Sequence, residues 1–412
     1  MTPGSPGLGS HWSGTALAES CAMTTVLLAH ASAELYGSDL QLVETAAACA
    51  DAGATVVVAL PDHGPLAERL AAVGARVEVV DTPVLRKAQL SPRGLVGLAA
   101  HTVRALGPMV RLVRRLRPAA VLVNTLTIPA WLVAARLAGV GPVCHVHEAE
   151  ADVPRVLRWG LAAPLLLARQ VVVNSEAARG VVVGDLPMLG RRTRVVYNGV
   201  PGPDVPPEAP RSGRGPAQVV LVGRLSPRKG NDVALEAVAR LRREGRDVRL
   251  ALCGSVFSGY EWFEDQLRQR AAEPDLAGAV ELPGYVEPWD WFARADVVVV
   301  PSRVEPFGNV AVQALLARRP VVVSRTQGLA EIVRDGETGL LVPPDDPGAL
   351  AAAVGALLDA PDRAAALAEA GRRDAEERFG AARYRADLRT VLLGAGAAPG
   401  GRKSGLKDPT TA

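Results

Sequence analysis

Residues 217–238 read AQVVLVGRLSPRKGNDVALEAV, and this stretch decides the fold. It begins with an apolar run, turns at Gly223 and continues from Asn231 with the apolar spacing of an amphipathic helix. A short strand that is apolar on both faces is typical of a parallel sheet buried between helices. A strand, a glycine-bounded turn and a helix make up half of a βαβ unit. The stretch therefore predicts an α/β fold with a parallel sheet.

The same alternation of short apolar runs and helical stretches occurs on both sides of this segment. Between the two arrays, residues 201–216 contain six prolines and almost no large apolar residue, which is the composition of a linker. Two such arrays predict two doubly wound, Rossmann-like domains facing across a cleft, with ligands bound beyond the carboxyl ends of the strands. The predicted strands cover residues 25–29, 55–60, 76–80, 120–124, 143–147, 170–174 and 194–197, and then 218–223, 248–253, 280–283, 297–301, 321–324 and 340–342.

The composition excludes several classes of protein. With 49% hydrophobic residues, the chain of 412 residues has enough apolar material for a core, which excludes wholesale disorder. A net charge of +3 gives no reason to expect nucleic acid as a partner. The four cysteines form no CxxC pair, which excludes a disulfide framework and the usual zinc spacings. No lysine or arginine precedes Arg69, so an ordinary signal peptide is not predicted and we expect a cytoplasmic protein.

Two cations flank the glycine-bounded turn of residues 223–230. Arg224 lies at the predicted strand end and Lys229 at the start of the predicted helix. Gly223 lets the backbone approach a ligand, and a helix N-terminus supplies unpaired N–H groups and the positive end of the helix dipole. This combination favours binding of a diphosphate. The alternative is a basic turn that is simply solvated.

The motif VEPFGNVAVQAL supplies a second group of candidates beyond a predicted strand. Glu305 lies just past the strand end. Gly308, Asn309 and Val310 offer backbone N–H groups at the start of a helix, and Gln313 falls in its first turns. A carboxylate suits sugar hydroxyls or a developing cation, and an amide suits a vicinal diol. Alternatively, Glu305 caps the helix and Gln313 is an ordinary polar residue.

Glycine marks two other turns between a strand and a helix. Gly328 permits close backbone approach in the turn QGLAE, where Glu331 is expected to be a first-turn acid of the helix. In the first array, Gly37 precedes a helix and lets a ligand approach. Ser38 or Asp39 is the expected N-cap of that helix.

The motif HVHE ends a strand of the first array. Alternation along the strand sends His145 and His147 to the same face. No further metal-type ligand neighbours them, so a metal site is not predicted. A histidine at a strand end commonly has a structural role, but His147 faces the predicted cleft, which favours a functional one.

Together these motifs resemble the retaining glycosyltransferases of family 4, which have the GT-B fold. The resemblance is carried by GRLSPRKG, VEPFGNVAVQAL, GLAEIV with DGETGLLVPPDD, and VVYNGV before the linker. It implies that Arg224 and Lys229 hold the diphosphate of a nucleotide-sugar donor and that Glu305 contacts the donor sugar. Gly37 then borders the donor phosphate and the acceptor, and His147 faces the transferred sugar. The other predicted donor-binding residues are Gly223, Gly308, Asn309, Val310, Gln313 and Gly328.

The resemblance covers residues 24–392 and implies a domain plan. An acceptor-binding domain and a donor-binding domain are joined by the linker, and a C-terminal helix returns to the first domain. The expected divisions are a disordered tail (1–23), the acceptor domain (24–199), the linker (200–217), the donor domain (218–371), the returning helix (372–393) and a second disordered tail (394–412).

The chain departs from the family pattern at Gln313, where the family has a second glutamate that holds the ribose diol. Glutamine hydrogen-bonds a diol without charge assistance, so we expect donor affinity to fall by roughly 1–2 kcal/mol. The segment 253–259 is longer than the usual glycine-rich turn, and Gln327 stands where a glycine pair is common. These departures bear on donor identity more than on the class of reaction.

The resemblance also implies transfer with retention of anomeric configuration, in which the cations stabilise the leaving nucleoside diphosphate. The leaving phosphate oxygen takes the acceptor proton. The chain contains no Asp-x-Asp motif, which agrees with chemistry that needs no metal and no cofactor. Closure of the two domains about the linker would assemble the site.

A basic helical stretch, residues 104–117, suggests a membrane partner. Its five arginines alternate with large apolar residues, so it can contact an anionic inner leaflet, as a lipid-linked acceptor would require. Alternatively, it is a crossover helix with a solvated face in an arginine-rich protein.

Three functions remain open from the sequence. The first is a retaining transferase that builds a cell-surface polysaccharide or glycolipid, and the second is the same enzyme acting on a small-molecule natural product. The third is a nucleotide-sugar binding protein without transfer activity, which Gln313 motivates. A nucleotide-sugar epimerase of related fold fits less well, because Glu305, Arg224 and Lys229 match the transferases.

Overall fold

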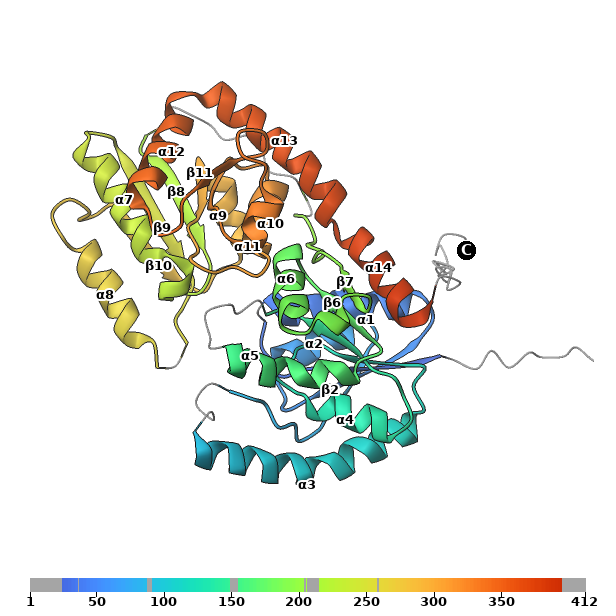
Figure 1. Ribbon diagram of the computed structural model, residues 1–412. Helices are drawn as coiled ribbons and strands as arrows, with labels where there is room; N and C mark the ends of the chain where they lie inside the picture. The colour runs from blue at the N-terminus through green and yellow to red at the C-terminus, as the bar shows by residue number, and fades with distance from the viewer. Residues whose placement is uncertain are drawn as a thin grey trace, which may run out of the picture.

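The computed structural model describes residues 24–35, 37–86, 91–148, 155–203, 205, 215–257 and 259–394. They form two α/β domains, each with a parallel sheet and helices, and a C-terminal helix that reaches the first domain (Figure 1). This is the predicted doubly wound architecture. The tails predicted to be disordered lie outside the described residues, apart from Gly394, as does most of the predicted linker.

The first domain has seven parallel strands in the order β3-β2-β1-β4-β5-β6-β7, so the winding direction changes between β1 and β4. The strands are β1 (Thr25–Ala29), β2 (Thr55–Leu60), β3 (Arg76–Val79), β4 (Ala120–Val123), β5 (Val143–Val146), β6 (Gln170–Val173) and β7 (Thr193–Val195). The α-helices are α1 (Gly37–Asp51), α2 (Pro65–Ala72), α3 (Pro92–Leu116), α4 (Ala130–Leu137), α5 (Arg155–Ala162) and α6 (Glu176–Asp185).

The second domain has six parallel strands in the order β10-β9-β8-β11-β12-β13, with the change of direction between β8 and β11. The strands are β8 (Ala217–Val222), β9 (Val248–Cys253), β10 (Val280–Gly284), β11 (Val297–Val300), β12 (Val321–Ser324) and β13 (Leu340–Val342). The α-helices are α7 (Asn231–Arg243), α8 (Glu261–Ala271), α9 (Pro288–Arg294), α10 (Asn309–Leu316), α11 (Gln327–Ile332), α12 (Pro347–Asp359) and α13 (Pro361–Phe379).

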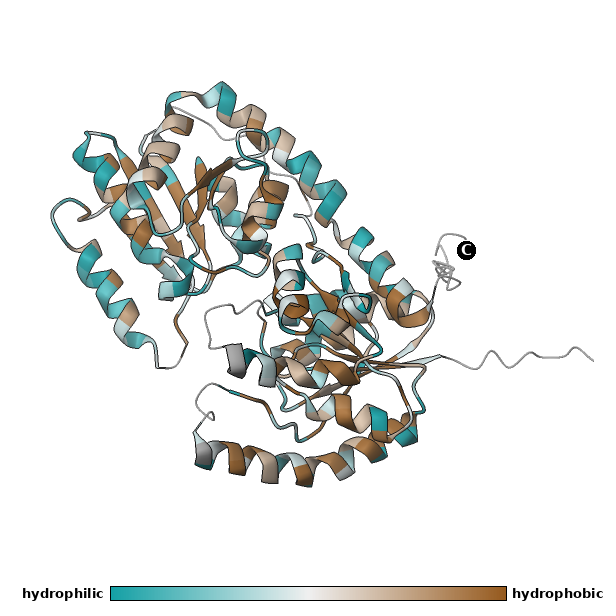
Figure 2. Cartoon of the chain, in the orientation of Figure 1, coloured by the Kyte–Doolittle hydropathy of each residue, from teal (hydrophilic) through white to brown (hydrophobic). Residues whose placement is uncertain are grey.

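Helices cover both faces of each sheet, which explains the continuous apolar runs. In β1, Val26 and Leu28 pack in one core cluster, and Leu27 and Ala29 pack in the cluster on the opposite face. Figure 2 shows the strands of both sheets in hydrophobic colours. Because each sheet is buried on both faces, side chains that act on a ligand are left to the loops beyond the strand ends.

The helix expected over residues 372–393 is interrupted. Gly380 has extended backbone angles and separates α13 from α14 (Ala381–Leu393). Phe379 remains in the core of the second domain, whereas Tyr384 and Leu388 are buried in the first domain's core. The Tyr384 hydroxyl lies 2.8 Å from Thr45 Oγ1 of α1. It is therefore α14 that packs into the core of the first domain.

Within the described residues, no helix combines the length and the apolar character that crossing a membrane would require.

Candidate functional site

The first domain gathers polar side chains where its winding direction changes. His30 follows β1, Asn124 follows β4 and His147 follows β5. His147 Nε2 lies 3.1 Å from Asn124 Oδ1, and Asn124 Nδ2 lies 3.2 Å from His30 Nδ1. His30 Nε2 lies 2.5 Å from Asp39 Oδ1. This is the position at which doubly wound sheets bind ligands.

The two histidines of the HVHE motif lie on the same face, as alternation predicted, but their surroundings differ. Their ring centroids are 4.0 Å apart. His145 is fully buried, and burial lowers its pKa to about 3, which makes it a neutral core residue. His147 is half-buried, and desolvation, followed by the neighbouring His145 and His30, holds its pKa well below the usual value. His147 is therefore also neutral.

Glu148 lies beside His147. Its carboxylate accepts hydrogen bonds from the Thr125 hydroxyl and, at 2.9 Å, from the His147 backbone N–H. Burial raises the pKa of Glu148 despite these bonds.

In the second domain, the residues predicted to bind the diphosphate and the sugar, Lys229 and Glu305, form a pair beyond the ends of β8 and β11. Lys229 Nζ lies 2.5 Å from Glu305 Oε2, and the Ser302 hydroxyl donates to the same oxygen at 3.2 Å. Glu305 does not cap α10, whose N-cap is Gly308 without a side-chain hydrogen bond. The capping alternative for Glu305 is therefore wrong.

Arg224 and Gly223 lie at the end of β8. The Arg224 guanidinium carbon is 3.2 Å from the centroid of the Phe257 ring, a cation–π contact that holds the half-buried arginine. The Gly223 N–H donates to Cys253 O at 2.9 Å. Phe257 belongs to the segment whose unusual length the sequence showed. The turn is thus a packed structure and not a simply solvated one.

The start of α10 reaches the first domain. Asn309 and Val310 are the first two residues of this helix, so their N–H groups have no carbonyl partner within it. Asn309 Oδ1 accepts a hydrogen bond from Asn198 Nδ2 at 2.9 Å. A Cβ atom on Gly37 would lie only 3.0 Å from Asn309 Nδ2. Gly37 therefore gives room to the second domain itself.

Close approaches between loops bring the two halves of the site together. Asn124 Nδ2 lies 3.3 Å from Ser38 O, next to Gly37. On the other side of Asn309, a Cβ atom on Gly308 would lie 3.5 Å from Glu305 Cγ. The chain of neighbours thus runs from the histidines of the first domain to Lys229 of the second.

The two remaining predicted donor-binding residues are Gly328 and Gln313. Gly328 is buried, and its N–H donates to Glu305 O at 3.1 Å. A Cβ atom there would lie 2.5 Å from Phe307 O, so only glycine allows this approach of the two loops. Gln313 is half-buried in the second turn of α10, and none of the side-chain hydrogen bonds between described residues involves it.

The sequence reasoning missed Arg303. Its guanidinium pairs with Asp232 at 2.7 Å and with Asp345 at 2.6 Å, and its backbone N–H donates to the backbone carbonyl of Arg228 at 2.9 Å. Arg303 thereby ties the turn that carries Lys229 to the loop that carries Glu305. In an arginine-rich chain, only its place between Ser302 and Glu305 could have pointed to it.

Two expectations about acids at helix starts are wrong. Asp39 is the third residue of α1, buried at 1% exposure, and its carboxylate binds His30; α1 begins at Gly37, so Ser38 is also inside the helix. Glu331 is the fifth residue of α11, and its carboxylate accepts from the N–H groups of Glu176 (2.9 Å) and Ala177 (2.7 Å). Glu331 therefore caps α6 of the other domain, where the helix dipole favours a carboxylate.

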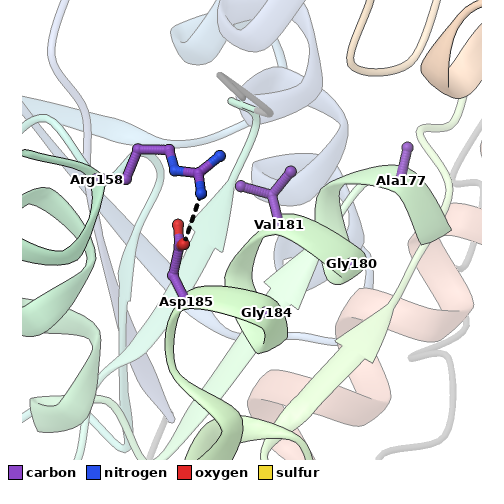
Figure 3. A pocket seen from close by; sticks show the side chains of 6 residues that line it. All are labelled: Arg158, Ala177, Gly180, Val181, Gly184 and Asp185. Carbon is purple, nitrogen blue, oxygen red and sulfur yellow. Dashed lines mark ion pairs between the residues drawn. The ribbon is translucent and has the colours of Figure 1, made fainter. Parts of the chain in front are cut away.

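A pocket of about 400 Å³ lies in the first domain, between α5 and α6 (Figure 3). Arg158 and Asp185 form an ion pair of 3.1 Å in its wall. None of the predicted site residues lines this pocket. In the described part of the chain, no three His, Cys, Asp or Glu side chains are grouped so that they could hold a metal ion.

The chain matches two known families over most of its length. Residues 37–201 match the family described as Glycosyltransferase Family 4, and residues 216–360 match Glycosyl transferases group 1. A D-inositol 3-phosphate glycosyltransferase from Streptomyces avermitilis is 30% identical over 368 residues, which cover 76% of this chain and 77% of the relative. The glycogen synthase of Mycobacterium tuberculosis is 38% identical over 181 residues, 43% of this chain and 42% of the relative. This chain thus matches less than half of that relative's length.

Solved structures share the fold. Anabaena HepE in complex with UDP and glucose superposes with a TM-score of 0.75 at 21% identity, covering 89% of this chain and 99% of that one. Sucrose-phosphate synthase from Thermosynechococcus elongatus gives 0.69 at 20% identity, with 90% and 98% covered. The two-domain GT-B architecture and the match over three quarters of the Streptomyces relative agree with the motifs. The chain belongs to glycosyltransferase family 4.

Proposed function

We propose that the protein is a retaining glycosyltransferase. It moves a sugar from a nucleotide-sugar donor to a glycan or lipid-linked acceptor, in the synthesis of a cell-surface polysaccharide or glycolipid. The observation that supports this proposal best is that His147 and the Lys229–Glu305 pair, from the two domains, are linked through the neighbouring residues Asn124, Gly37 and Asn309. A donor bound by one domain and an acceptor bound by the other can meet between these residues.

The chemistry of each part fits this reaction. Lys229 lies just before α7 and Arg224 lies just after β8, where these two cations can stabilise the leaving diphosphate. The first N–H groups of α10 add to the same electrostatic effect. The Glu305 carboxylate can stabilise positive charge that develops on the donor sugar. The leaving phosphate oxygen takes the acceptor proton, and we propose that no metal or cofactor takes part.

A thermal-shift screen against nucleoside diphosphates and nucleotide sugars tests the donor site. UDP and UDP-glucose come first, because the structures of Anabaena HepE contain them. A ligand at about 100 times its dissociation constant should stabilise the protein by about 2.7 kcal/mol. A shift confined to one base would identify the donor class, and turnover should then persist in excess EDTA. If none of the nucleotides gives a shift, the proposal is contradicted.

Gln313 allows a sharper test of the donor site. Gln313→Glu should tighten UDP binding by roughly 1–2 kcal/mol, about tenfold, because a carboxylate accepts the ribose hydroxyls with charge assistance. Isothermal titration calorimetry measures the change, and Gln269→Glu, an exposed position of α8 in the same domain, controls for the added charge. A clear loss of affinity would show that Gln313 does not hold the ribose.

We also propose that α3 brings the acceptor domain to an anionic membrane surface. This helix has five arginines and no acidic residue, and Figure 2 shows hydrophobic residues along it. Val96 and Val103 are 71% and 73% exposed, and Leu95 is 47% exposed. Exposed apolar side chains among arginines suit the boundary between lipid headgroups and acyl chains.

Flotation with phosphatidylglycerol and phosphatidylcholine vesicles measures this binding. We expect recovery with the anionic vesicles only, and a loss of about tenfold or more in the variant Val96→Ser/Val103→Ser, because less apolar surface is buried. Trp262→Ser, a half-exposed position on α8 of the other domain, serves as the control. Equal recovery of the Val96→Ser/Val103→Ser variant would favour a helix face that is merely solvated.

The other two functions have their own signatures. A natural-product transferase would bind the donor but float with neither type of vesicle. A binding protein without transfer activity would show the thermal shift but would release no nucleoside diphosphate from its donor, with or without acceptor.

A further inference from the structure

A chain of hydrogen bonds lies beneath His147 in the first domain. It joins Asp39 of α1, His30 after β1 and Asn124 after β4 to His147 after β5. Asp39, His30 and Asn124 are 1%, 2% and 0% exposed, so the chain is sealed from solvent up to the half-buried His147. Buried polar groups of this kind adopt the arrangement that satisfies every donor and acceptor.

The Asn124 amide can take only one orientation. Its Nδ2 lies 3.3 Å from Ser38 O, a carbonyl oxygen that can only accept. Nδ2 therefore points to Ser38 and to His30 Nδ1, and Oδ1 points to His147. Since Oδ1 only accepts, His147 Nε2 must carry the proton that it donates.

The hydrogen bonds at the Asp39 end require the same direction of donation. His30 Nδ1 faces the Asn124 NH₂ group and so accepts, which leaves the His30 proton on Nε2. That proton is donated to Asp39 Oδ1, which also accepts from the Ser32 hydroxyl at 2.7 Å. The Asp39 carboxylate and the Ser38 carbonyl thus require the same direction of donation. In each of these hydrogen bonds, a donor faces an acceptor.

His147 Nδ1 is left as a lone-pair acceptor. Among the described residues, the His147 ring hydrogen-bonds only to Asn124, through Nε2. Nδ1 is therefore not used by this bond, and it is not a buried unsatisfied atom. Together with the tilted contact with His145, the bond at Nε2 fixes the plane of the ring.

We propose that Asp39, His30 and Asn124 are positioning residues that hold His147 as its Nε2-protonated tautomer, so that Nδ1 accepts a hydrogen bond from a hydroxyl group of the transferred sugar. The proposal rests on the proposed function only for the identity of the hydroxyl donor. Because Asn124 also bonds to Ser38, it links the orientation of His147 to the turn at Gly37 that meets the second domain.

The tautomer can be measured directly. Long-range ¹H–¹⁵N spectra of protein labelled with ¹⁵N-histidine distinguish a protonated ring nitrogen from a bare one, and loss of a signal in His147→Gln assigns His147. At neutral pH we expect a proton on Nε2 and a bare Nδ1. A proton on Nδ1, or on both nitrogens, would overturn the proposal. This measurement needs no substrate, so it tests the protonation state that the hydrogen bonds impose on His147 even if the proposed function fails.

Two substitutions of His30 separate positioning from space filling. His30→Asn keeps an acceptor near the Nδ1 position, whereas His30→Leu fills more of the volume but accepts nothing. With UDP-glucose as the donor probe, kcat for release of UDP should fall about tenfold or more in His30→Leu, with KM little changed, and His30→Asn should retain more activity.

A merely structural role predicts the reverse order, with His30→Leu as active as His30→Asn or more so, and that result would contradict the proposal. If His30→Leu does not fold, or if UDP-glucose is not turned over, the wild-type spectrum decides. His101→Leu, at a histidine paired with Asp81 on the surface, is the control for loss of an imidazole elsewhere in the domain.

Discussion

Glu305→Gln is expected to lower turnover by about two to three orders of magnitude, the range found when one preorganised electrostatic group is removed from an active site. The amide fills the same space but carries no charge to offset positive charge on the donor sugar. Binding of UDP, which lacks the sugar, should change little, because Lys229 loses its 2.5 Å partner and remains available to phosphate. Steady-state release of UDP from UDP-glucose, together with calorimetry of UDP binding, measures both quantities.

The matched control for this variant is Glu337→Gln. Glu337 lies in the same domain, in the turn before β13, and its side chain is 71% exposed. The substitution makes the same change of charge outside the site, and turnover should stay near that of the wild type. If Glu305→Gln also retained full turnover, Glu305 would have no part in the reaction.

Lys229→Met is expected to weaken binding of UDP and UDP-glucose by about 10- to 100-fold, because a hydrogen bond to a charged group contributes about 1.5–3 kcal/mol. The Lys229 side chain is 26% exposed and that of Glu305 is 12% exposed, so the lost charge is only partly replaced by water. The glutamate left unpaired would also repel the diphosphate. Calorimetric titration with UDP measures the effect.

Arg228→Met is the neighbouring control. Arg228 lies one residue away, is exposed and donates to the Val304 carbonyl, so UDP affinity should change little when its charge is removed. The double variant Lys229→Met/Glu305→Gln completes a cycle in which the paired change should cost less than the sum of the single ones. Unchanged UDP binding in Lys229→Met would exclude the residue from the phosphate site.

Much of the fold was predictable because each strand depends on a few consecutive apolar residues. The runs Thr25–Ala29, Val248–Cys253 and Val321–Ser324 have the predicted bounds, since apolar residues on both faces leave a parallel strand as the favoured structure. The turn that carries Lys229 and the loop that carries Glu305 were identified for the same reason. A glycine, a strand end and a helix start lie within ten residues of one another.

The acids were harder to interpret. Asp39 and Glu331 each lie near the start of a helix, so local rules assigned them to their own helix ends. Asp39 instead binds His30 beneath the site, and Glu331 binds the start of α6 in the other domain. His30 is nine residues from Asp39 and the start of α6 is about 155 residues from Glu331, and no spacing in the sequence marks either pair.

By itself, therefore, the sequence determined the strands, the glycine turns and the charged residues that follow β8 and β11. Only the tertiary structure decided that His30, Asn124 and His147 meet, because β1, β4 and β5 become neighbours through the order of strands in the sheet. It also decided that α14 packs on α1 and that Asn309 reaches Asn198. Propensity and capping act over a few residues, whereas these contacts depend on strand order and on how the two domains pack.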